Sequence, residues 1–226
     1  MYIISDSTNL LIIGKTYPQI QHMSDDYISC VEKSVQTINF NDKIDYTPNL
    51  NSFRLEFKAK LTDSLSCVPA KYGALIVSEK LLKVFLDSNI ESYQYFEANV
   101  IYRKKDYKYF YFFIYGQNYD LVDYKNMKFW GESKPEYNHT IREYDMSTIT
   151  RKEIKVEQPD QIDNWMKLYP NHPNMKYEVV KLNIENIKHD MVRLPFKIGG
   201  YYVVNEDLKN KILKAGCTGI DCIMKD

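Results

Sequence analysis

Cysteine, glycine and tryptophan are scarce in this chain of 226 residues, which contains four, eight and two of them respectively. The four cysteines are unclustered, and four residues separate the last two where a metal knuckle or redox pair has two: Cys30, Cys67, Cys217 and Cys222. We therefore expect buried free thiols. A phosphate-binding loop needs several glycines to let backbone amides approach the anion, so the isolated Gly199-Gly200 pair predicts only a tight turn.

An excess of charge and long apolar runs are also absent. Thirty Lys and Arg balance thirty Asp and Glu, so the formal net charge is zero, which disfavours binding to nucleic acid or to an anionic membrane. The longest apolar run of the N-terminal stretch, Leu10 to Ile13, is far shorter than the roughly 7 to 15 residues of a signal-peptide core. No run approaches the ~18 residues of a membrane span. We expect a cytoplasmic protein with neither nucleic acid nor membrane as its partner.

Residue patterns that carry catalysis or bind metal are not found. Ser64 and Ser66 lack the flanking glycines of a nucleophile elbow. The adjacent Asp25 and Asp26 are better explained by a helix start than by acid-base chemistry. The four histidines are scattered without metal-ligand spacing: His22, His139, His172 and His189. The sequence predicts no catalytic residue, no metal site and no cofactor, and hence no enzyme.

Two segments follow the same pattern of strand, helix and strand, 127 positions apart. Residues 73–96 and 200–223 each begin with a short apolar run, which ends at a helix-capping residue, Ser78 or Asn205. In both, a glutamate follows the cap, where the helix dipole favours a carboxylate. An apolar stripe then predicts the buried face of each helix, with Leu81, Phe85 and Leu86 in the first and Leu208, Ile212 and Leu213 in the second. Asn89 and Gly216 are expected to end the helices.

These segments predict an α+β fold with mixed sheets, in which two related units form two lobes or two halves of one compact chain, residues 1–226. If the two strands of a unit lie in one sheet, they must run parallel. Residues 93–115 predict a hairpin that reverses at Arg103 to Asp106, and the continuous apolar run of its second arm indicates burial on both faces. Further expectations are strands at 2–4, 10–13, 53–57, 176–182 and 191–197, and helices at 24–38 and 161–169.

The irregular stretch between the two units, residues 116–173, is the best candidate for partner binding. Interface centres favour Trp, Tyr and Arg, and loops on a rigid scaffold often carry recognition. Large aromatic residues dominate protein cores as well, so burial is the competing interpretation, above all for the tryptophans. The candidate partner-binding residues are Tyr119, Tyr124, Trp130, Tyr137, Arg142, Tyr144, Trp165 and Tyr169.

Four segments of the chain carry a resemblance to a known family: AKLTDSLSCVP, GALIVSEKLLKVFLDSNIESYQYFEANV, YFFIYGQNYDLVDYKN and the C-terminal VVKLNIENIKHDMVRLPFKIGGYYVVNEDLKNKILKAGCTGIDCI. The resemblance is to the immunity proteins of bacterial polymorphic toxin systems. It covers about residues 53–130 and 176–226. It implies a non-enzymatic, cytoplasmic inhibitor that binds a cognate toxin domain, and it assigns no binding residue. The zero net charge departs from the acidic inhibitors of basic nucleases.

Two other hypotheses remain open. An enzyme of unrecognised type requires a deep pocket with convergent titratable groups. A structural or regulatory module that associates with itself requires exposed sheet edges or aromatic patches. The sequence does not determine the oligomeric state.

Overall fold

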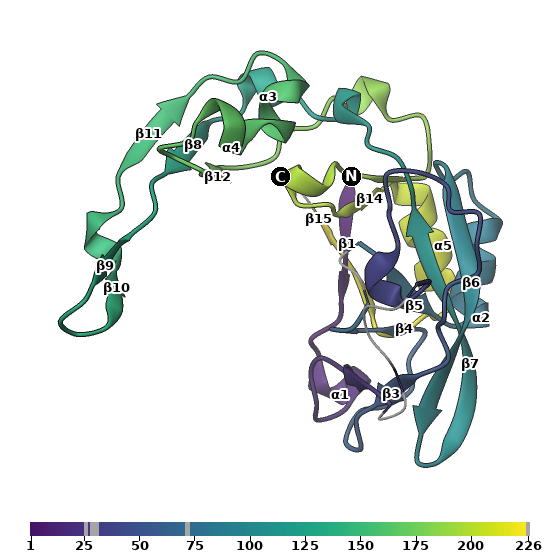
Figure 1. Cartoon of the computed structure of the whole chain (residues 1–226). Helices are drawn as coiled ribbons and strands as arrows, with labels where there is room; N and C mark the ends of the chain where they lie inside the picture. Colours follow the sequence, from purple (N-terminus) through teal and green to yellow (C-terminus); the bar gives the residue numbers. More distant parts are fainter. Residues whose placement is uncertain (25–26, 28–31, 71–72, 225–226) are drawn as a thin grey trace. The chain divides into compact units, whose positions relative to one another are not determined.

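The structure is a computed structural model that describes all residues except 25–26, 28–31, 71–72 and 225–226. The fold is α+β, as the sequence predicts. The chain divides into two compact units: unit 1 comprises residues 1–118 and 188–226, and unit 2 comprises residues 119–187. Figure 1 shows the helices and strands of both units.

Unit 1 contains a six-stranded sheet in the order β2-β3-β6-β7-β5-β4. Only β3 and β6 pair in parallel; the other neighbours are antiparallel. The strands are β2 (Ile20–Met23), β3 (Phe53–Leu55), β4 (Ser64–Leu65), β5 (Leu75–Val77), β6 (Tyr93–Tyr102) and β7 (Lys105–Ile114).

The hairpin of β6 and β7 confirms the prediction for residues 93–115, with unbroken pairing from Tyr93–Ile114 to Tyr102–Lys105. Side chains of β7 enter two cores in alternation, as the pleat of a strand dictates. Tyr111 and Phe113 join the core beneath residues 35–50, and Phe112 joins the core that contains the two long helices. Burial on both faces explains why this strand is almost wholly aromatic and aliphatic.

The second sheet of unit 1 has the order β13-β14-β1-β15, and every neighbouring pair is antiparallel. Its strands are β1 (Tyr2–Asp6), β13 (Met191–Arg193), β14 (Tyr202–Val204) and β15 (Ile220–Met224). The expected strand-helix-strand elements are present, and each of the two segments has parallel outer strands with one antiparallel strand between them: β7 separates β5 from β6, and β1 separates β14 from β15. That the two segments are related units stays a prediction.

The helices of these segments, α2 (Glu79–Leu86) and α5 (Glu206–Lys214), begin at the predicted caps. Oγ of Ser78 accepts a hydrogen bond from the amide of Leu81, and Oδ1 of Asn205 accepts one from the amide of Leu208. Both helices bury their apolar faces in one core. The predicted stripe was too wide, because Leu86 and Leu213 are exposed.

Three other local predictions are wrong or incomplete. Leu10–Ile13 is a one-turn helix, α1, because Oδ1 of Asn9 accepts a hydrogen bond from the amide of Leu11 and starts a turn. Most of the first part of the helix expected at 24–38 lies outside the described residues; its end is interrupted by Lys33, whose φ is +65°. Helix α2 ends before Asn89, whereas Gly216, with a φ of +62°, does follow α5.

Unit 2 is built on a three-stranded sheet in the order β11-β8-β12 and a separate hairpin of β9 and β10. Its elements are β8 (Phe129–Glu132), β9 (Glu136–Asn138), β10 (Glu143–Asp145), β11 (Arg151–Ile154), β12 (Asn174–Tyr177), α3 (Pro159–Asp163) and α4 (Trp165–Leu168). The single helix expected at 161–169 is therefore two short helices that meet at Asn164. The 3-10 helices among the described residues of both units are η1 (Val35–Thr37), η2 (Tyr119–Leu121), η3 (Tyr124–Asn126), η4 (Met146–Thr148), η5 (Ile184–Asn186) and η6 (Phe196–Ile198).

Candidate functional site

All eight residues predicted to bind a partner lie in unit 2, but they occupy two different environments. Trp165 is buried: its Nε1 donates to the carbonyl of His172 at 3.0 Å, and its ring packs against Phe129 and Tyr169. Trp130 is half-buried on the central strand β8, and its buried Nε1 has no hydrogen-bond partner among the described residues. The tryptophans thus contribute to the core of unit 2.

Tyr119 and Tyr124 are half-buried on the 3-10 helices η2 and η3. The hydroxyl of Tyr119 donates a hydrogen bond to the carboxylate of Asp163. Burial, this hydrogen bond and the negative charge of Asp163 together raise the pKa of Tyr119. Its hydroxyl is therefore committed to an internal contact and remains protonated at neutral pH.

The other three predicted residues, Tyr137, Arg142 and Tyr144, come together on the hairpin of β9 and β10. Tyr137 and Tyr144 are cross-strand partners whose ring centroids lie 5.1 Å apart in an edge-to-face arrangement. The ring of His139 lies 5.0 Å from that of Tyr137. Arg142 occupies the left-handed region at the end of the turn, with a φ of +57°. We call residues 136–145 the aromatic hairpin.

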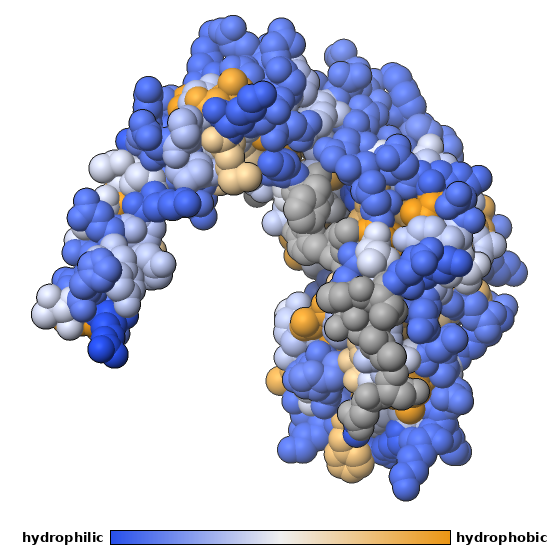
Figure 2. All heavy atoms as spheres, in the orientation of Figure 1, coloured by the Kyte–Doolittle hydropathy of each residue, from blue (hydrophilic) through white to orange (hydrophobic). Residues whose placement is uncertain are grey.

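Every side chain of the two strands of the aromatic hairpin is exposed to solvent. Tyr137 and Tyr144 have exposed fractions of 42% and 65%, and Ile141 in the turn is 63% exposed. Figure 1 shows the hairpin extending beyond the three-stranded sheet of its own unit, and Figure 2 shows pale, less hydrophilic side chains along it. Exposed aromatic side chains on a projecting segment are typical of a recognition surface.

Hydrogen bonds at its base and turn hold the aromatic hairpin in its conformation. The amide of Glu136 donates to Oγ1 of Thr148 at 2.8 Å, and the amide of Ser147 donates to Oδ1 of Asp145 at 2.9 Å. In the turn, Oδ1 of Asn138 accepts a hydrogen bond from the amide of Thr140.

The charge of the aromatic hairpin is negative, unlike that of the chain as a whole. It carries three carboxylates and one guanidinium: Glu136, Glu143, Asp145 and Arg142. Hydrogen bonds from the side chain and backbone of Ser147 hold the pKa of Asp145 below its usual value, so this carboxylate is ionised at neutral pH. A positively charged surface is the complementary partner.

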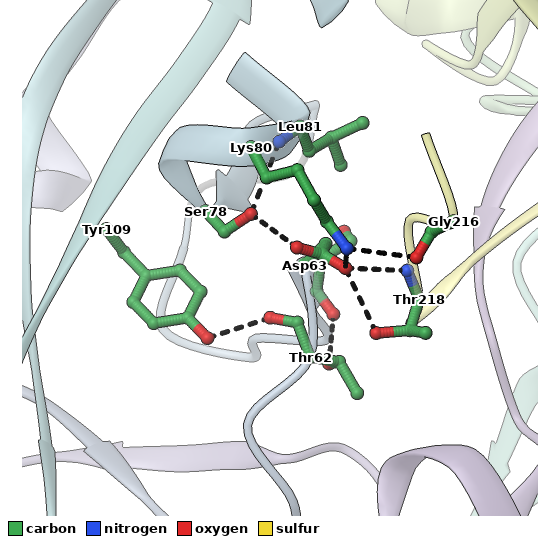
Figure 3. Close-up of polar contacts among 9 residues, drawn as sticks. Thr62, Asp63, Ser78, Lys80, Leu81, Tyr109, Gly216 and Thr218 are labelled. Atoms are coloured by element: carbon green, nitrogen blue, oxygen red, sulfur yellow. Dashed lines mark hydrogen bonds and ion pairs between the residues drawn. The ribbon is translucent and has the colours of Figure 1, made fainter. Parts of the chain in front are cut away.

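A polar cluster around Asp63 in unit 1 connects side chains and backbone of several elements (Figure 3). The carboxylate of Asp63 accepts hydrogen bonds from Oγ of Ser78 at 2.7 Å and from the amide of Thr218 at 2.8 Å, and it pairs with Nζ of Lys80 at 2.8 Å. Burial acts to raise the pKa of Asp63, but these contacts outweigh it and lower the pKa. Because Lys80 also donates to the carbonyl of Gly216, the cluster joins the start of α2 to the loop after α5. We interpret it as a structural brace.

A cleft of about 480 Å³ in unit 1 contains a carboxyl group with an altered pKa. Asp6, Tyr17 and Cys67 line it, and burial raises the pKa of Asp6 to about 6. Burial also raises the pKa of Cys67 to about 12, so the thiol stays protonated and is not a nucleophile. Cys67, Cys217 and Cys222 are free and partly buried, whereas Cys30 lies outside the described residues.

Within the described part of the chain, no group of three or more His, Cys, Asp or Glu side chains is placed to hold a metal ion. No helix in that part is both long and apolar enough to cross a membrane. Comparisons with protein-family models, curated proteins and solved structures found no match to this chain.

Proposed function

We propose that the chain is a non-enzymatic inhibitor that acts in the bacterial cytoplasm by binding a cognate toxin domain through the aromatic hairpin. The observation that carries this proposal is a hairpin with a cross-strand aromatic pair, in which every side chain of both strands is exposed to solvent. The resemblance to immunity proteins of polymorphic toxin systems supplies the class of partner.

The exposed tyrosines of the aromatic hairpin are better suited to binding a partner than to stabilising the fold. Tyrosine gives a large, rigid contact area and is enriched among the residues that dominate binding energy. Because the cross-strand pair of Tyr137 and Tyr144 is formed before binding, less ordering entropy is lost when a partner covers it. The three carboxylates of the hairpin favour a toxin surface that carries lysine or arginine, and their charge would speed association.

The first experiment is co-expression of the chain with the polypeptide encoded next to it, with co-purification and rescue of growth as readouts. Replacing both Tyr137 and Tyr144 by serine should weaken the complex by at least about 30-fold, since each ring is placed to contribute about 1 kcal/mol or more, and should abolish rescue. The matched control replaces Tyr95 and Tyr201 of unit 1, each 42% exposed, by serine, and should leave both readouts unchanged. Equal loss in both double variants would contradict a role for the hairpin.

An enzyme is the second candidate, favoured by Asp6 in its cleft. A carboxyl group with a pKa of about 6 is suited to general acid-base chemistry near neutral pH. Asp6→Asn distinguishes the two proposals: it should abolish rescue if Asp6 acts chemically and preserve rescue if the hairpin binds the toxin. Self-association through the bare hairpin strands, the third hypothesis, is tested by sedimentation of the purified chain at micromolar concentration.

A further inference from the structure

A second cleft of unit 1, of about 590 Å³, lies at the turn between β6 and β7. We call it the turn cleft. Its wall is formed by the end of β2, by β3 with the residues that follow it, and by the turn itself. The side chains that matter here are His22, Arg54, Glu56, Phe57, Arg103 and Lys104. The volume is within the range of small-molecule sites, about 300 to 1,000 Å³.

The two central residues of the turn beside the cleft are of types that rarely adopt the backbone conformation found there. Arg103 and Lys104 are the two central residues between the paired Tyr102 and Lys105, and their φ angles are +50° and +62°. A turn with two positive φ angles favours Asn-Gly, which enter this region at the lowest cost. Backbone strain of this kind is concentrated at functional sites. We therefore look for a function of the Arg103 and Lys104 side chains, because folding alone does not favour them at these positions.

Contacts of Arg103 leave its hydrogen-bond donors available. Its guanidinium carbon lies 5.0 Å from the ring centroid of Tyr102 and 5.4 Å from that of Phe57. Stacking against ring faces uses the plane of the guanidinium and leaves its N–H edges free for an anion. In the described part of the chain, neither Arg103 nor Lys104 forms an ion pair with a carboxylate.

Phe57 adds an apolar surface beside these cations, because its ring is 72% exposed. Arg54 and Glu56, which carry opposite charges, also line the wall. Although the net charge of the whole chain is zero, the positive charges of Arg103 and Lys104 lie beside the exposed ring of Phe57 in this cleft. Phosphate groups bind arginine through paired N–H donors, and planar bases stack on aromatic rings.

We propose that the turn cleft binds a mononucleotide, with its phosphate on Arg103 and Lys104 and its base against Phe57. The cleft thus selects a ligand in which a phosphate and a planar ring occur together. A nucleotide within a single strand of nucleic acid offers the same chemistry, and the experiment separates the two sources. This site shares no residue with the aromatic hairpin, so the two proposals fail independently.

The test is calorimetric titration of the full chain with the mononucleotides AMP, GMP and dTMP, with adenosine, with inorganic phosphate, and with an oligodeoxythymidine of eight nucleotides. AMP or GMP should bind at least tenfold more tightly than adenosine or phosphate alone. No detectable binding of either nucleotide at millimolar concentration would overturn the proposal, as would binding of the oligonucleotide without binding of a mononucleotide, including dTMP.

Two variants locate the site. R103N/K104G introduces the residues that the turn prefers, so its thermal midpoint should equal or exceed that of the native chain while nucleotide affinity falls at least tenfold. Phe57→Ser should reduce nucleotide affinity to that of phosphate and leave phosphate affinity unchanged. The control K152N/K176N removes the same charge from exposed strands of unit 2 and should bind as the native chain does. Unchanged nucleotide binding by R103N/K104G would overturn the assignment.

Discussion

The two hairpins of this protein use similar residues for opposite purposes. Both β6–β7 and β9–β10 are antiparallel, contain tyrosines and place an arginine at positive φ in the turn. In β7 the aromatic side chains enter two cores, with Phe112 packed on Phe85 and Phe113 on Phe40. In the aromatic hairpin they pack only on one another and on His139.

This contrast shows that aromatic content does not by itself distinguish a core strand from a recognition strand. The difference is whether other elements pack against the strands. Helix α2 packs on one face of β7 and residues 35–50 pack on the other, whereas the side chains of β9 and β10 are exposed. Since an isolated two-stranded hairpin is only marginally stable in water, the second hairpin gains most from being covered by another molecule.

The largest expected difference is in amide hydrogen exchange. Amides of β7 that pair with β6 should open only with global unfolding, at a cost of roughly 5 to 15 kcal/mol, and so should be protected more than about 1,000-fold. Amides of β9 and β10 should exchange within about tenfold of unprotected rates, because local opening there exposes no core. Mass spectrometry of exchanged peptides from residues 105–114 and 136–145 measures both. Equal protection would contradict the comparison.

The second largest difference between the two hairpins is expected in the free energy of unfolding when one aromatic ring is removed from each. Phe112→Ala leaves a cavity in the core of unit 1 and should lower the free energy of unfolding by about 3 to 5 kcal/mol. Tyr144→Ala removes an exposed ring and should change it by less than about 0.5 kcal/mol. Urea unfolding followed by circular dichroism gives both values. A loss above about 1 kcal/mol for Tyr144→Ala would mean that the ring has a structural role.

A smaller effect is expected in the pH dependence of stability, which should depend on Asp6 of unit 1 and not on Asp145 of the aromatic hairpin. Asp6 is partly buried in its cleft and its folded-state pKa is about 6, against about 3.9 unfolded. The unfolded chain therefore releases its proton first, and this group lowers stability as pH rises from about 4 to 6. Asp6→Asn should match the native chain at pH 4 and be more stable by about 1 to 3 kcal/mol at pH 7.

The control for this pH effect is Asp145→Asn on the aromatic hairpin. Asp145 is fully exposed and its pKa is lowered by Ser147, so its replacement should leave the pH dependence of global unfolding unchanged. Denaturant titrations at pH 4, 5, 6 and 7 measure the difference between each variant and the native chain. A difference for Asp6→Asn that stays constant with pH would show that burial does not raise its pKa.

The sequence predicted those parts of the fold that depend on local chemistry. The caps Ser78 and Asn205 were recognised because side-chain oxygens act within a few positions, and the reversal at Arg103 because a charged run separates two largely apolar strands. Leu10–Ile13 was expected to be a strand, since four apolar residues fit a buried strand or a helical turn equally well. The pairing of β1 between β14 and β15 depends on contacts between opposite ends of the chain, such as Tyr2 with Val204 and with Met224, and left no local signal.

The candidate site was predictable only as a region. Residues 116–173 were selected for tyrosine, tryptophan and arginine, but composition does not show that Trp165 is buried while Tyr137 and Tyr144 are exposed. The turn cleft was missed altogether. A signal was present in the basic Arg103-Lys104 pair, at positions where a two-residue turn favours Asn-Gly.

The smallest expected effects come from the turns themselves. A non-glycine residue in the left-handed region costs roughly 1 to 2 kcal/mol, part of which glycine loses again through its greater freedom in the unfolded chain. Lys104→Gly should therefore raise the global free energy of unfolding by about 0.5 to 1 kcal/mol, because the β6–β7 hairpin unfolds with the core. Arg142→Gly should leave it unchanged and instead slow amide exchange in β9 and β10 by about two- to fivefold, since the aromatic hairpin opens alone. If Arg142→Gly raised global stability as much as Lys104→Gly, the aromatic hairpin would be part of the cooperative fold, and its proposed availability to a partner would need another basis.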